Sequence, residues 1–114
     1  MTAEFRGRTR IRGQALHTLA QAVTAEAMHI QHTQVQTALH DRETDLEIEA
    51  RTPINSKAIE RCRNSETNTV YAEMKQVRQR VTERFSALSG MNVSGVNLIL
   101  TGITTPKEDE RRVK

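Results

Sequence analysis

The stretch from Thr82 to Gly102 changes its hydrophobic period at Gly90, and this change constrains the fold more than any other feature of the chain. Before Gly90, apolar residues recur every three or four positions, as on one face of an α-helix. After Gly90, they recur at every second position, as on one face of a β-strand. Gly90 itself suits the residue just past a helix end, where a positive φ is favoured. The sequence therefore predicts a helix, a glycine stop and a strand in succession.

The helix before Gly90 is the longer of two predicted amphipathic helices. We expect it to begin near Asn68 or Thr69, because either residue can cap its first turn. Its inward stripe consists of Val70, Met74, Val77, Val81, Phe85 and Leu88. The other helix is predicted from Gln14 to about Met28, after a break at Gly13. Its stripe consists of Leu16, Leu19, Val23, Ala27 and Ile30.

The segment from Gln34 to Arg51 is predicted to form a β-hairpin. Its polar turn lies at residues 41–44, and apolar residues alternate with polar ones in the second arm. The side chains that point away from the core in that arm are Asp45, Glu47, Glu49 and Arg51. We expect this face to be exposed and acidic, and Pro53 to end the strand.

Two further segments complete the secondary structure. Residues 55–63 are expected to form one or two helical turns, which the polar residues 64–68 then break. The last strand is predicted to direct Val96, Leu98 and Leu100 towards the core. Gly95 suggests a β-bulge, and Gly102 with the Thr105-Pro106 pair is expected to end the strand.

The predicted order is strand, helix, strand, strand, helix, strand, with residues 8–12 as a short first strand. This order indicates an α+β fold: a two-layer sandwich in which two helices cover one face of a small, mostly antiparallel, four-stranded sheet. Residues 1–8 are expected to form a flexible arm, residues 9–104 a single domain, and residues 105–114 a charged tail.

Composition excludes several classes of function. The chain has 114 residues, of which 36% are apolar, and only three aromatic side chains, so a large cofactor pocket is not expected. Its net charge of +3 is low for a protein whose only task is to bind phosphates. The single cysteine fits a reducing compartment, and no stretch reaches the ~18 apolar residues of a membrane span. With no apolar leader in its first residues, the chain is expected to be cytoplasmic.

No arrangement of reactive side chains predicts catalysis. His29 and His32 are three residues apart, but a zinc site needs three or four convergent ligands, and Cys62 is far away in the sequence. Cys62 itself has no activating context beyond two neighbouring arginines, so packing is the favoured interpretation. The carboxylates of the hairpin share one environment, whereas acid–base catalysis needs two. We therefore expect no catalytic, cofactor-binding or metal-binding residues and no small-molecule substrate.

Three charged surfaces are candidates for interaction. The first is the alternating row Arg6, Arg8, Arg10 and Arg12, which would project from one face of an extended arm. It could bind phosphates or anionic headgroups, or simply protect an edge strand from aggregation; the last is favoured because no aromatic side chains interleave with the arginines. The second is the outer face of the long helix, with Lys75, Arg78, Arg80 and Arg84. The third is the acidic face of the hairpin.

The segment from Val81 to Ile103 resembles the C-terminal signature of the alkaline shock protein family, the envelope-stress-response family of Gram-positive bacteria. Ser89-Gly90 stands where that family usually has Thr-Gly. The strand positions of the signature are occupied by Val93, Val96, Leu98, Leu100 and Gly102. Residues 7–27 are similar to the family's opening strand and first helix, and residues 35–54 to its central hairpin. The chain departs from the pattern in lacking a glycine after the first helix, and residues 55–68 resemble an insertion.

The resemblance implies a non-enzymatic protein, since the family lends no catalytic residues. Some members collect at the cytoplasmic membrane through a membrane-anchored partner and help to maintain the cell envelope under stress. We therefore expect a cytoplasmic scaffold or adaptor that self-associates or that docks on a membrane-anchored protein. Self-association is expected because faces of opposite charge on one molecule favour head-to-tail assembly. The alternative hypothesis is a nucleic-acid-binding module that uses the N-terminal arginine row.

Overall fold

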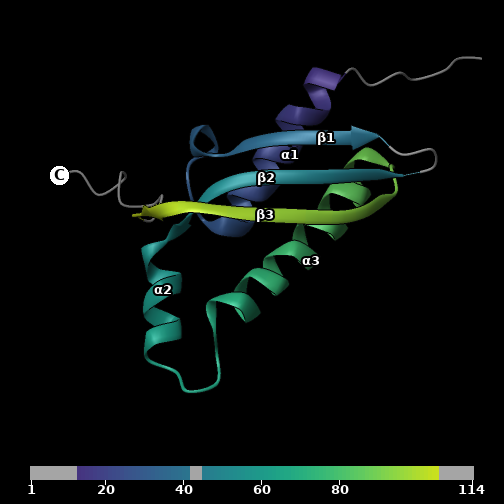
Figure 1. Cartoon of the computed structure of the whole chain (residues 1–114). Helices are drawn as coiled ribbons and strands as arrows, with labels where there is room; N and C mark the ends of the chain where they lie inside the picture. The colour runs from purple at the N-terminus through teal and green to yellow at the C-terminus, as the bar shows by residue number, and fades with distance from the viewer. Residues whose placement is uncertain (1–12, 42–44, 106–114) are drawn as a thin grey trace, which may run out of the picture.

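The computed structural model describes residues 13–41 and 45–105, and the described part has an α+β fold (Figure 1). Its helices are α1 (Gly13–Met28), the 3-10 helix η1 (His32–Gln34), α2 (Ser56–Arg63) and α3 (Val70–Ser89). Its strands are β1 (Gln36–Asp41), β2 (Leu46–Asn55) and β3 (Val93–Thr104). The α+β class, the two amphipathic helices and the hairpin are therefore confirmed.

The three strands form one sheet in the order β1-β2-β3, and the sheet is mixed. Strand β1 pairs with β2 in antiparallel fashion, whereas β2 and β3 run parallel. The prediction of a mostly antiparallel sheet is wrong for these strands, because the chain leaves β2 and returns to β3 through α2 and α3. A crossover of this kind, unlike a hairpin, brings the second strand back in the same direction. The predicted strand at residues 8–12 lies outside the described residues.

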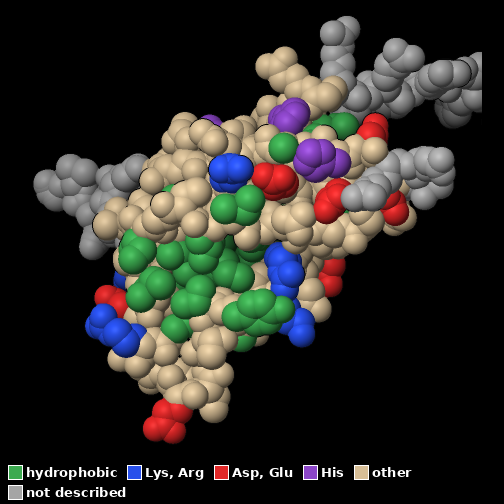
Figure 2. All heavy atoms as spheres, in the orientation of Figure 1, with side chains coloured by type: hydrophobic (Ala, Val, Ile, Leu, Met, Phe, Trp, Pro, Cys, Tyr) green, Lys and Arg blue, Asp and Glu red, His purple; other side chains and the backbone are tan. Residues whose placement is uncertain are grey.

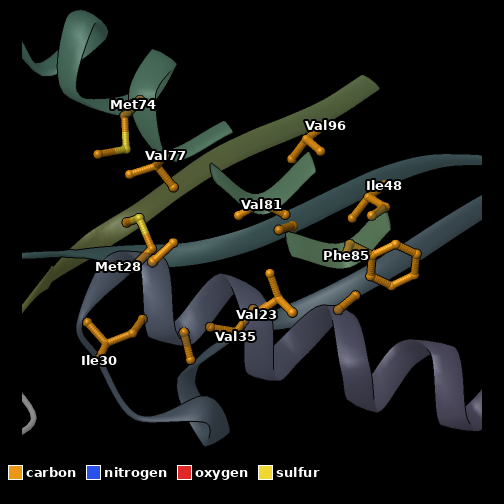
Figure 3. Packing of buried hydrophobic residues seen from close by; sticks show 14 of the residues in the cluster. Val23, Met28, Ile30, Val35, Ile48, Met74, Val77, Val81, Phe85 and Val96 are labelled. Atoms are coloured by element: carbon orange, nitrogen blue, oxygen red, sulfur yellow. The ribbon is translucent and has the colours of Figure 1, made fainter. Parts of the chain in front are cut away.

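Helices α1 and α3 pack together on one face of the sheet, and no element of residues 13–41 and 45–105 covers the other face (Figure 1). The core lies between them, as Figure 3 shows: Val81 and Phe85 from α3 lie close to Val23 from α1 and Ile48 from β2. Phe85 is completely buried, but Leu88, one turn later, is 52% exposed. The predicted apolar stripe of α3 is thus correct except at Leu88, in the last turn of the helix.

Local capping chemistry fixes both ends of α3. The hydroxyl of Thr69 accepts a hydrogen bond from the Ala72 N–H at 3.0 Å, as predicted for an N-cap. Gly90 has a φ of 77°, and its N–H donates to the Ser86 carbonyl at 2.8 Å. The glycine stop read from the sequence is therefore confirmed, with the left-handed conformation that glycine adopts most easily.

Helix α1 ends in the same conformation without a glycine. His29 has a φ of 60°, and its N–H donates to the Glu26 carbonyl, while the Ile30 N–H donates to the Ala25 carbonyl. These two bonds, with the buried Ile30, make a Schellman motif. Histidine thus occupies a position for which glycine is preferred.

Strand β2 ends further along the chain than predicted, whereas β3 ends where predicted. Strand β2 passes through Pro53 to Asn55, because the ladder with β3 shifts register between Thr52 and Ile54. A proline, which has no N–H to donate, is tolerated at such an irregularity. Strand β3 passes through Gly102 and ends at Thr104, directly before the Thr105-Pro106 pair that was expected to end it. The predicted bulge is confirmed, since the register also shifts where Glu47 pairs with Gly95.

Candidate protein-interaction surface

Strand β3 forms an edge of the sheet: within residues 13–41 and 45–105, β2 is its one neighbouring strand. It is 12 residues long and contains neither a charged residue nor a proline. Natural edge strands are usually short or protected by charges, prolines or bulges, because their free N–H and C=O groups can pair with another chain. The opposite edge, β1, has 6 residues and exposes His40 and Asp41. Two irregularities in the pairing with β2 interrupt this edge, one at Gly95 near its start and one between Leu100 and Ile103 near its end.

An apolar hollow of about 410 Å³ lies beside this edge. We name it the β3 hollow; its lining residues are Val70, Tyr71, Met74 and Arg78 from α3 and Asn97, Leu98 and Leu100 from β3. Figure 2 shows hydrophobic side chains gathered below β3 in a patch with basic side chains at its borders. Tyr71 is 73% exposed and Leu100 is 37% exposed, so the hollow opens to solvent.

The course of α3 explains the hollow. The helix crosses the sheet diagonally, so that its C-terminal half lies behind the strands and its first turns extend past β3 (Figure 1). Val81 and Phe85 are therefore enclosed, whereas Val70 is only partly buried and Tyr71 faces solvent. The N-terminal half of α3 thus forms a floor beside β3 on which another chain segment could lie.

Arg78 is the charged residue of the hollow. Its guanidinium carbon lies 5.8 Å from the centre of the Tyr71 ring, a cation–π contact. No carboxylate among the described residues forms an ion pair with Arg78, and no acidic residue lines the hollow. The hollow therefore combines aliphatic walls, one aromatic ring and one cation without an anionic partner.

The basic residues predicted to share one face of α3 lie in two places. Arg78 lines the β3 hollow, whereas Arg80 and Arg84 line a different hollow beside Glu26 and His29 of the α1 end. Because successive residues of an α-helix are about 100° apart, Arg80 projects far from Arg78 and close to Arg84. Lys75 is exposed and lies closer in angle to Arg78. The prediction of a single basic face is therefore wrong.

Polar groups hold α2 against the start of α3. The Arg61 guanidinium donates two hydrogen bonds to Glu73, at 3.2 and 3.1 Å, and the Asn68 amide donates a third at 2.8 Å. The bonds from Arg61 lower the pKa of Glu73, and Glu73 in turn raises the pKa of Arg61. Arg61 and Glu73 line a second hollow of about 410 Å³ between α1, α2 and α3, but there they bind each other.

The open face of the sheet carries the acidic residues of the hairpin. Glu47 accepts a hydrogen bond from the Asn97 amide at 2.9 Å. Glu49 lies 3.6 Å from the Arg51 guanidinium and 3.7 Å from the His40 imidazole. Asp45 precedes β2 and is half-buried. Glu47 and Glu49 are also half-buried, and only Arg51 of the predicted set is exposed. Basic and polar neighbours balance the charge of this face, so the prediction of an exposed acidic face is only partly correct.

The remaining candidates are dispersed. The row Arg6, Arg8, Arg10 and Arg12 lies outside the described residues. His17 shares a hydrogen bond with Thr37 at 3.0 Å, and Cys62 is half-buried on α2. Within the described part of the chain, no three His, Cys, Asp or Glu side chains lie close enough together to bind one metal ion.

Sequence reasoning missed the β3 hollow, although a signal was present. Leu98, Ile99 and Leu100 are consecutive apolar residues, so both faces of β3 are apolar, whereas a strand with one wet face should alternate. Tyr71 lies beside the apolar stripe of α3 and not within it. The combination of a two-sided apolar strand and an aromatic residue outside the stripe indicates an uncovered apolar surface.

Comparison of the chain with family models, curated proteins and solved structures finds no match. Over the described ranges, none of the helices has the length and apolar character needed to cross a bilayer. Function is therefore argued from the edge of β3, the β3 hollow and the charges around them.

Proposed function

We propose that this protein is a non-enzymatic adaptor or scaffold that binds a protein partner at the free edge of β3. The observation that carries the proposal is a 12-residue uncharged edge strand beside an open apolar hollow. Proteins that recognise extended segments by strand addition use these two elements. Backbone hydrogen bonds along the edge provide affinity, and a neighbouring hollow selects alternate side chains.

The exposed side chains around the hollow are of the kind that dominates binding energy. Tyrosine and arginine are enriched among the residues that contribute most to protein interfaces. Here Tyr71 and Arg78 stack on one another at the margin of an aliphatic surface that includes Leu100. Covering this surface would bury the Tyr71 ring and complete the hydrogen bonding of β3.

The family resemblance supplies the biological setting of the proposal. It suggests a stress-response protein of the Gram-positive cell envelope that stays in the cytoplasm and reaches the membrane through a membrane-anchored partner. Self-association is the other way in which the same edge could be covered. The nucleic-acid alternative is less well supported, because Arg78 diverges from Arg80 and Arg84 and these residues do not form one track for phosphates.

Site-specific photo-crosslinking tests the proposal. A photoreactive phenylalanine analogue is placed at Tyr71 or, as the matched control, at His40 on the β1 edge, and irradiated in cells that produce the protein. We expect a discrete protein adduct from position 71 that disappears in the Leu100→Lys background, and none from position 40. An adduct with the mass of two chains would identify self-association. Equal labelling from both positions, or labelling of nucleic acid, would contradict the proposal.

A further inference from the structure

We propose that the occupant of the β3 edge is an extended, acid-bearing segment of another protein, with aliphatic side chains at alternate positions and an Asp or Glu facing Arg78. This inference rests on the proposed function and adds the chemistry of the partner. Two independent observations carry it: the free apolar edge, and the absence of an anionic partner for Arg78 within the described residues.

The geometry of the β3 edge is the reason why the bound segment should be extended. A strand laid along β3 would direct every second side chain onto the floor that Val70 and Met74 form. Those positions must be aliphatic, because the hollow beside Leu98 and Leu100 offers them few polar groups. The alternate side chains would point to the open face of the sheet, where polar residues are tolerated.

The positive charge of Arg78 in the β3 hollow is the reason why the bound segment should be acidic. A purely apolar strand would cover the Arg78 guanidinium and remove water from it without replacing the lost hydrogen bonds, which is costly. A carboxylate facing Arg78 would restore them in the planar two-bond geometry that arginine and carboxylate share. Lys75, exposed near Arg78 on the same helix, adds to the positive potential that the segment would meet.

A second copy of the chain fits this surface less well. Strand β3 contains no acidic residue, so a β3–β3 pairing would offer Arg78 no carboxylate from the added strand. A two-fold interface also brings the same surface of both copies together, so the two Arg78 side chains would face a common interface. Like charges in that setting disfavour the pairing.

The segments of the chain beyond the described residues also lack the required pattern. Residues 1–12 contain four arginines and one glutamate, so their charge has the same sign as Arg78. Residues 106–114 contain three acids, but Val113 is their one aliphatic residue. Neither segment alternates aliphatic side chains around a carboxylate, so a partner protein is the better source.

A selection from a random library of displayed 12-residue peptides tests the inference with the full chain. Peptides are selected for binding to the wild-type protein and against binding to the Leu100→Lys variant. We expect the enriched peptides to share alternating aliphatic residues and one Asp or Glu at a fixed place in the pattern. The most enriched peptide is then synthesised, together with a version in which that acid is replaced by lysine.

A charge exchange then separates recognition from folding. The Arg78→Glu variant is expected to bind the acidic peptide at least about tenfold more weakly than the wild type, and to prefer the lysine version. Such a reversal cannot arise from a misfolded variant, which would lose both peptides. Arg84→Glu is the matched control, because Arg84 lies on the other side of α3 and should leave both affinities unchanged.

The outcomes distinguish this inference from the function on which it rests. Peptides that bind equally well with acid or lysine would overturn the acidic partner but leave strand addition at β3 intact. A dimer in analytical ultracentrifugation that Leu100→Lys dissociates would also overturn the inference, because the occupant would then be a second copy. Failure to enrich any peptide that depends on Leu100, in a chain that stays monomeric, would overturn both proposals.

Discussion

The two halves of α3 look alike in the sequence but differ in the structure. Val81 and Phe85 in the C-terminal half are completely buried between α1 and the sheet. In the N-terminal half, Met74 and Val77 are buried as well, but at the first turn Val70 is only partly covered and the adjacent Tyr71 is 73% exposed. The apolar spacing is continuous through both halves, so periodicity indicates which side of a helix faces inward but not whether anything covers it. Coverage depends on where α3 passes the edge of β3.

The largest effect is expected at the enclosed half. Phe85→Ala should lower the free energy of unfolding by about 3–5 kcal/mol, because it removes a completely buried ring and leaves a cavity. Urea denaturation followed by circular dichroism measures this loss. Phe85→Leu, which retains much of the volume, should cost clearly less. A loss below about 1 kcal/mol for the alanine variant would mean that this half is not the core.

The next largest effect on stability is expected at Gly90, the helix stop that ends the enclosed half of α3. Gly90→Ala is expected to cost about 1–2 kcal/mol, because alanine is strained in the left-handed conformation. Apart from the residues next to Gly90 in the chain, no described residue has an atom within 4 Å of the added methyl group, so the cost is conformational and not steric. Gly90→Asn should cost less in the same thermal melts, since asparagine tolerates this conformation. Equal losses for the two variants would contradict this explanation.

At the start of α3, the ion pair between Arg61 and Glu73 adds to the core burial of Met74 and Val77, and its contribution should depend on pH. Because Arg61 lowers the pKa of Glu73 in the folded state, the pair stabilises the protein above the pKa that Glu73 has in the unfolded chain. That stabilisation is lost as the pH falls through the lower, folded-state pKa. Since Arg61 is exposed to solvent, we expect less than about 1 kcal/mol.

Comparing the wild type with Glu73→Gln isolates this contribution. The stability difference between the two proteins should be constant near neutral pH and shrink in acid, as measured by urea midpoints across the pH range. A difference that does not change with pH would show that the glutamine variant loses packing and not the charge interaction.

The smallest effect on stability is expected at the β3 hollow. Tyr71→Ser should change the free energy of unfolding by only about 0.5 kcal/mol, because the ring is mostly exposed and loses mainly its contact with Arg78. The same substitution should abolish crosslinking from a photoreactive group at position 100. A destabilisation as large as that of Phe85→Ala would show that the two halves of α3 are equivalent after all.

Local chemistry made much of the fold predictable. Thr69 and Gly90 define the ends of α3 through their own backbone preferences, and the alternation around Ile48 identifies a strand with one buried face. The parallel pairing of β3 was not predictable in this way, because it depends on contacts between residues about 50 positions apart. The prediction that Pro53 ends β2 was wrong for a related reason. Whether a proline interrupts a strand depends on the register of the neighbouring strand, here β3.

The candidate site was less predictable than the fold. The charge pattern of the sequence predicted one basic face with Arg78, Arg80 and Arg84. The helix geometry and the position of β3 place Arg78 in a different hollow from the other two. Tyr71 was visible as an aromatic residue, yet its importance comes from exposure beside an uncharged edge. A surface formed by two distant segments has no local signature in either of them.

Hydrogen exchange of the backbone amides in the dilute free protein tests the central claim most directly. If β3 is an open edge, every second amide between Val96 and Thr104 should exchange rapidly, because it has no partner in β2, while the amides of Ile48 to Thr52 stay protected. Adding the selected acidic peptide should then slow the fast amides of β3. Protection of every β3 amide in the free monomer would contradict the account, because the edge would already be covered.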